Sequence, residues 1–296
     1  MRPAGRCTTK VSDTMSNPPD WIDFNGLPAV RIAAPDGATA IITAHGAQLV
    51  SWVPARGRER LYLSDRSTFA PGKAIRGGVP VIFPQFAERG GGPRHGFART
   101  TKWELDESHG GADFACATLF LEDSAATRAH WPHAFRAELT VAVSGARLDI
   151  ELEVENRGTA PFDFTAALHT YLRVAEVETV CVEGLQGHSY EDNAAGGASH
   201  IDRAETLVVG GEVDRLYPDA PATLLLRERG RSLALQSDGF RDAVIWNPWE
   251  EKCAALADMP PDGFRRMLCI EAANAARSIR LEPDATWFGR QTLVEV

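Results

Sequence analysis

Apolar and polar residues alternate with a period of two along much of this chain, a pattern typical of strands that bury one face. The clearest run covers 148–155, where apolar residues alternate with three glutamates, and a second covers 135–143. Similar runs predict strands over 114–121, 162–174, 177–183, 223–227 and 279–282. Turn-forming pairs such as Ser144-Gly145 separate the runs. The pattern therefore predicts an all-β fold, as a large antiparallel sandwich or barrel.

Helical periodicity is weak, and the best short helix candidate covers 247–258. No linker rich in Pro, Gly or Ser forces a domain boundary, so we expect one domain over 21–296. Residues 1–20 have few apolar side chains to bury and are expected to form a flexible N-terminal extension. This segment lacks the apolar stretch of a secretory signal, and nothing in the sequence is long enough to predict a membrane span.

Charge and cysteine content exclude several classes of protein. The net charge is −9, from 31 basic and 40 acidic residues, which disfavours a nucleic-acid partner. The five cysteines are an odd number and none are spaced as C-x-x-C, so neither a disulfide framework nor a zinc site is predicted. A reducing compartment fits this composition best, and we expect a cytoplasmic protein without membrane association.

One segment differs in charge from the rest of the chain. Residues 73–102 carry six cations and one anion, a local charge of +5, and glycines adjoin Arg76 and His95. Arginine suits bidentate phosphate recognition, and glycine lets the backbone approach a ligand. A solvated surface loop with scattered charges explains the same composition, and charge alone favours that alternative.

Three further residues could carry acid–base chemistry. His169 lies in an apolar, strand-like run, where a histidine is either a hydrogen-bonded core residue or a proton shuttle facing a pocket. Glu271 follows buried-type residues, where a carboxylate is costly unless it is paired, functional or at a strand end that reaches water. Asp214 stands beside an arginine and says little by itself. Nucleotide-binding, zinc-protease and serine-hydrolase motifs are missing from the sequence, which leaves His and Glu chemistry without a metal.

Six segments stand in the order of one family's motifs: IRGGVPVIFPQF, PRHGFAR, LHTYLRV, GEVDRLY, VIWNPW and CIEAA. Over residues 21–296 the chain resembles the aldose 1-epimerase-like superfamily, and within it the hexose-6-phosphate mutarotase branch. The resemblance implies a large antiparallel β-supersandwich of the galactose mutarotase type. It also implies a sugar-phosphate substrate, no cofactor and no metal. We expect a monomer or weak dimer.

The resemblance also implies roles for single residues. His169 corresponds to the general acid and Glu271 to the general base of anomer exchange, while Asp214 corresponds to a ligand of sugar hydroxyls and His95 to an active-site partner. We expect the acid and the base on neighbouring strands of one concave pocket, farther apart than a direct hydrogen bond, so that a hexose ring fits between them.

The resemblance finally implies that Arg76, Arg94 and Arg99 contact the substrate and its phosphate. Together with the acid–base pair, they predict interconversion of the α and β anomers of a hexose 6-phosphate, glucose 6-phosphate first. Two alternatives remain open. One is a mutarotase for free aldoses such as galactose or glucose, and the other is a non-catalytic carbohydrate-binding module on the same fold.

Overall fold

The computed structural model describes residues 15–16 and 19–296. Most of the predicted extension, residues 1–14 and 17–18, lies outside the described residues. Within 1–20, strand β1 (Met15–Ser16) pairs with β7 (Glu104–Gly110), and β2 begins at Asp20. Paired strands therefore start inside the segment predicted as an extension, and its flexibility elsewhere stays a prediction.

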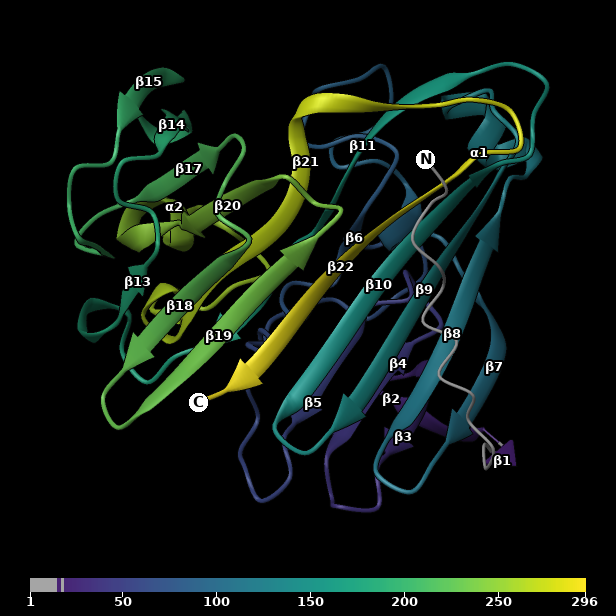
Figure 1. The fold of residues 1–296 in the computed structure, drawn as a ribbon, viewed down its shortest axis with the longest axis horizontal. Helices are drawn as coiled ribbons and strands as arrows, with labels where there is room; N and C mark the ends of the chain where they lie inside the picture. Colours follow the sequence, from purple (N-terminus) through teal and green to yellow (C-terminus); the bar gives the residue numbers. More distant parts are fainter. Residues whose placement is uncertain (1–14, 17–18) are drawn as a thin grey trace, which may run out of the picture.

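In the described residues, antiparallel strands build three sheets, and the largest has ten strands (Figure 1). In sheet order these are β1, β7, β8 (Ala115–Glu122), β9 (Phe135–Ser144), β10 (Arg147–Asn156), β22 (Thr286–Glu295), β19 (Arg231–Asp238), β18 (Thr223–Glu228), β13 (Cys181–Glu183) and β16 (Thr206–Val208). Figure 1 shows β10, β22 and β19 running side by side across the molecule, with β22 between the other two.

A second sheet of eight strands carries the residues of interest. Its order is β15 (Ala198–Ile201), β14 (Ser189–Asp192), β17 (Val213–Tyr217), β20 (Asp242–Asn247), β21 (Met267–Leu281), β11 (Phe162–Leu168) and β6 (Val81–Ile82), and β12 (Tyr171–Arg173) also pairs with β21. The third sheet is the meander β2 (Asp20–Phe24), β3 (Leu27–Ala33), β4 (Thr39–Thr43) and β5 (Leu49–Val53).

Helices are few and short in the described part of the chain. They are α1 (Ala125–His130), α2 (Trp249–Ala255) and the 3-10 turns η1 (Ala98–Thr100), η2 (Val177–Thr179), η3 (Asn193–Ala195) and η4 (Gly263–Arg266). The predicted helix over 247–258 corresponds to α2. Among the described residues, no helix combines the length and the apolar character needed to cross a bilayer.

Period-two alternation predicts the strands well where it is regular. Along β9 and β10 every second side chain is fully buried, as expected. The predicted strand 162–174 is interrupted, because the His169 amide donates to Pro80 and the Thr170 amide donates back to Leu168. The predicted strand 177–183 begins as η2 and becomes β13 only at Cys181.

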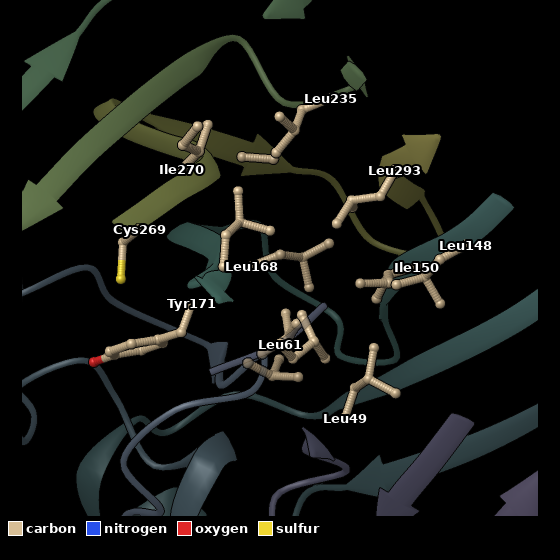
Figure 2. Close-up of a cluster of buried hydrophobic side chains, with 14 of the residues drawn as sticks. Leu49, Leu61, Leu148, Ile150, Leu168, Tyr171, Leu235, Cys269, Ile270 and Leu293 are labelled. Atoms are coloured by element: carbon tan, nitrogen blue, oxygen red, sulfur yellow. The ribbon is translucent and has the colours of Figure 1, made fainter. Parts of the chain in front are cut away.

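The hydrophobic core lies between the two larger sheets (Figure 2). Leu168 and Ile270 come from the eight-stranded sheet, and Leu235 and Leu293 come from the ten-stranded sheet; all four are at most 2% exposed. Because side chains alternate along a strand, the neighbours of Ile270 in β21 project from the other face of their sheet. That face is the one that carries the candidate chemistry.

Candidate active site

Glu271 and His169 are brought together by strand register. Leu168 of β11 pairs with Ala272 of β21, and Tyr171 of β12 pairs with Cys269. The link between β11 and β12 therefore runs beside Glu271. The two residues lie on neighbouring backbone segments, as the sequence predicted.

The separation of this pair differs from the expectation. His169 Nε2 lies 3.3 Å from Glu271 Oε1, so a sugar ring cannot fit between acid and base. The physical reason is that directly opposed residues on adjacent strands hold their Cβ atoms only about 4.5–5.5 Å apart. The expected gap is therefore wrong, and a substrate would have to lie over the pair.

Burial controls the protonation of the pair. Burial, and secondarily the charge of Asp214, holds the pKa of Glu271 well above its ordinary value. Burial also holds the pKa of His169 well below its ordinary value, helped by positive charge at Arg99 and Arg76. Both shifts favour the neutral forms, in which the pair shares one proton. Glu271 Oε2 and His169 Nδ1 are buried without a hydrogen-bond partner, and such atoms are uncommon in folded proteins.

His95 adds a second imidazole to the site. Its ring meets the His169 ring edge-on, with centroids 5.7 Å apart. Its Nδ1 accepts the amide hydrogen of Ala87, so the neutral ring carries its proton on Nε2. Burial, with the charges of Arg99 and Arg94, lowers the pKa of His95 to about 3, so this ring is neutral at physiological pH.

Arg76 is held beside the pair by two partners. Its Nε lies 3.2 Å from both carboxylate oxygens of Asp258, and its Nη1 donates to the Tyr171 hydroxyl over 3.0 Å. The Tyr171 ring in turn stacks on the His169 ring, 4.8 Å between centroids and 10° from parallel. The Trp246 ring meets His169 edge-on at 6.0 Å. The imidazole is thus fixed by aromatic contacts on two sides.

The other two predicted arginines have different environments. Arg99 is tied only to the Arg94 carbonyl, through Nη2, and its buried Nε has no hydrogen-bond partner. The Arg94 side chain is 60% exposed and pairs with Glu88 at the surface. The structure therefore brings Arg76 and Arg99 to the acid–base pair and leaves Arg94 in an exposed ion pair.

Asp214 reaches the same region from β17. Its register partner is Trp246, which itself pairs with Cys269, so Asp214 lies two strands from β21. Burial raises the pKa of its carboxyl, and the Asn193 side-chain amide, which donates to it over 3.2 Å, opposes that rise.

Glu271 lines a small cavity next to Ile270 and Gln291, and the other predicted site residues line none of the described cavities. A cavity of about 270 Å³ lies beside the 84–97 segment, against Phe97, Trp131 and Thr165. The concave pocket around His169 and Glu271 therefore stays a prediction.

Sequence reasoning missed two residues that build the site. Tyr171 lies two positions after His169, so period-two alternation could have placed it on the same face. Asp258 gave no signal, because 182 residues separate it from Arg76 and it follows a short helix.

Gly96 fixes the backbone that presents His95. Its φ is +69°, and a Cβ there would lie 2.0 Å from the Phe83 carbonyl oxygen. We expect Gly96→Ala to lower the free energy of unfolding by about 2–4 kcal/mol, from left-handed strain and steric overlap together. Urea unfolding measures this loss. Gly91→Ala is the matched control, because a Cβ there meets nothing within 4 Å. Equal stability for both variants would contradict the backbone argument.

Solved structures of other proteins share this fold, and two of them illustrate the match. One is a Salmonella typhimurium protein named "putative mutarotase", with a TM-score of 0.86 and 28% identity, covering 93% of this chain and 92% of that one. The other, at 13% identity, is a galactose mutarotase related enzyme of Lactobacillus acidophilus, with a TM-score of 0.72 over 90% of this chain and 96% of that one. The fold is thus an antiparallel β-supersandwich of the galactose mutarotase class, as expected.

The family follows from sequence. The pattern that defines aldose 1-epimerases matches residues 28–293, so the chain belongs to the aldose 1-epimerase family and is an isomerase. A relative from Cenchrus ciliaris, named "Putative glucose-6-phosphate 1-epimerase", is 34% identical over 282 residues, covering 92% of this chain and 86% of the relative. The resemblance drawn from the six motifs is confirmed.

Proposed function

We propose that this enzyme is a hexose-6-phosphate mutarotase that interconverts the α and β anomers of glucose 6-phosphate. One observation carries the proposal. The buried Glu271–His169 pair has two polar atoms without partners, and the unpartnered Nε of Arg99 belongs to the same charged cluster. The unpartnered atoms of the acid–base pair suit sugar hydroxyls, and the unpartnered arginine nitrogen suits a phosphate, so together they suit a ligand that carries both groups. The names of the relatives support the same substrate.

The proposed reaction needs two proton transfers. Glu271, as carboxylate, accepts the proton of the anomeric hydroxyl while the C1–O5 bond breaks and its electron pair goes to O5. His169, as imidazolium, donates a proton to O5, and the open-chain aldehyde results. After rotation about C1–C2, the hydroxyl at O5 returns its proton to His169 and attacks the other face of C1, and Glu271 returns the first proton to O1.

The pair starts this cycle with one proton in total. The neutral pair, a protonated Glu271 and a neutral His169, also holds one titratable proton. Moving that proton across the 3.3 Å contact from Glu271 to His169 gives the carboxylate and imidazolium that the reaction needs. Positioned acid–base catalysis contributes about 100-fold to 10,000-fold per group, or about 3–5 kcal/mol. His95, being neutral, can donate a hydrogen bond from Nε2 without competing for the proton.

Arg99→Ala tests the phosphate assignment. A dianionic phosphate gains charge-assisted hydrogen bonds from Arg99, each worth about 1.5–3 kcal/mol. We therefore expect kcat/KM for glucose 6-phosphate to fall roughly 10-fold to 100-fold, and that for free glucose to change much less. Anomer exchange measured by polarimetry or exchange NMR gives both rates.

The matched comparison is Arg94→Ala, since Arg94 is exposed and paired with Glu88. We expect less than about a threefold loss there, the scale of a surface ion pair. Equal losses for phosphorylated and free sugar in Arg99→Ala would instead favour a mutarotase of free aldoses. No exchange with either sugar in the wild-type protein would favour a carbohydrate-binding module.

A cytoplasmic location is part of this proposal. The four cysteines in the described part of the chain are free, and three of them are buried. A reducing compartment preserves such thiols. Hexose phosphates are charged metabolites that cross membranes poorly, which agrees with an enzyme that meets its substrate inside the cell.

A further inference from the structure

A thiol completes a three-residue donor cluster at the candidate active site. One nitrogen of His169, the sulfur of Cys269 and one carboxylate oxygen of Glu271 all lie within 4.8 Å of one another, and all three residues are buried. Cys269 and Glu271 occupy alternate positions of β21, so they share the face that His169 meets. The proposed mutarotase reaction uses the histidine and the carboxylate and gives the thiol no part.

The spacing of these donors is close to that of a tetrahedral metal site. Zinc binds nitrogen and oxygen at about 2.0–2.1 Å and sulfur at about 2.3 Å, which places neighbouring donor atoms about 3.3–3.6 Å apart. The separation of His169 Nε2 from Glu271 Oε1, 3.3 Å, equals one edge of that tetrahedron. The Cys269 sulfur must move by little more than about 1 Å to complete a face.

Partners and charges around the cluster permit a cation. Glu271 Oε2 has no hydrogen-bond partner, so a bound cation would not have to displace one from it. A thiolate and a carboxylate together neutralise a divalent ion. Arg76, whose charge acts on Cys269, is already paired with Asp258, and the carboxylate of Asp214 adds negative charge.

We propose that His169, Cys269 and Glu271 bind one zinc-class divalent cation, with the fourth position open to water, and that the bound ion excludes the sugar. A sulfur–nitrogen–oxygen donor set selects Zn²⁺ or Co²⁺ over Mg²⁺ and Ca²⁺, which prefer oxygen ligands. The cation is an inhibitor here and takes no part in anomer exchange. Exclusion of the sugar rests on the proposed function, whereas binding of the ion does not.

Cobalt titration without sugar tests the site directly. Co²⁺ added to the full chain should produce a thiolate-to-cobalt charge-transfer band and the intense visible bands of tetrahedral cobalt, saturating at one ion per chain. Zn²⁺ should bleach them, and excess Mg²⁺ should leave them unchanged. Cys269→Ser should remove the charge-transfer band, whereas Cys116→Ser, a buried thiol of the other large sheet, should retain it. Absence of the band in the wild type, or its persistence in Cys269→Ser, overturns the site.

A second variant guards against misfolding of Cys269→Ser. Glu271→Gln keeps the thiolate band and should weaken cobalt binding at least tenfold. Unchanged cobalt affinity in that variant overturns the three-residue assignment.

Zinc inhibition tests the exclusion of sugar separately. Zn²⁺ should inhibit anomer exchange of glucose 6-phosphate competitively in the wild-type enzyme. In Cys269→Ser the inhibition should be largely lost, so that the rate with Zn²⁺ approaches the rate without it. Cobalt bands without competitive inhibition overturn sugar exclusion alone. Cobalt bands in a protein that never catalyses anomer exchange overturn the proposed function and leave the metal site standing.

Discussion

Glu271→Gln is expected to lower kcat/KM for glucose 6-phosphate and for free glucose alike, by about 100-fold to 10,000-fold. The amide has the size of the carboxyl group but cannot take the proton of the anomeric hydroxyl. Both substrates should lose equally, because in the proposed reaction Glu271 acts on the ring and not on the phosphate. Anomer exchange rates of the two sugars, measured side by side, check this result.

Glu271→Gln should not lower the stability of the fold, although it lowers activity. A carboxyl that is 2% exposed and has one oxygen without a partner is costly to bury, so its replacement should leave the melting temperature unchanged or raise it. Glu151→Gln, on β10 of the other sheet, is the matched control for exchange rate. A Glu271→Gln enzyme with more than about a third of wild-type activity would remove Glu271 from the mechanism.

His169→Ala should also cost about 100-fold to 10,000-fold with both sugars, because His169 is the proton donor to the ring oxygen in the proposed reaction. The change leaves a space bounded by the Tyr171 and Trp246 rings. Imidazole added to the assay should enter that space and restore part of the rate. Rescue of this kind distinguishes a lost proton donor from a damaged fold.

His133→Ala serves as the matched control. That ring packs on Trp131 and Phe162, with centroids 4.6 and 5.2 Å away. The His133→Ala enzyme should keep the wild-type rate, and added imidazole should not change that rate. If His169→Ala retained its rate, or lost it for glucose 6-phosphate alone, the general-acid assignment would fail.

Local patterns predicted the fold best where burial is regular. β9 and β10 bury one face and leave the other half-buried, so apolar and polar residues alternate along both strands as the pleated sheet requires. α1 went unpredicted because six residues are too few for helical periodicity. Its start is marked only by Ser124 and Thr127, whose side chains each accept the other's amide hydrogen.

The candidate site shows where sequence reasoning stops. Motifs singled out His169 and Glu271, and strand order does place them together. Their 3.3 Å contact depends on the register of β11 and β12 against β21, which no local pattern encodes. Arg94 and Arg99 look equivalent in the sequence, yet Arg94 pairs with Glu88 at the surface, whereas Arg99 is half-buried with its Nε fully enclosed.

The place of β22 in the large sheet has a consequence for biosynthesis. This strand is last in sequence, yet it lies between β10 and β19 and pairs with both. Until Thr286–Glu295 leaves the ribosome, the two halves of the sheet cannot join, and each exposes an unpaired edge to other chains. The sheet can therefore close only after nearly all the described residues have been translated, and until then the unpaired edges of β10 and β19 are open to non-native pairing.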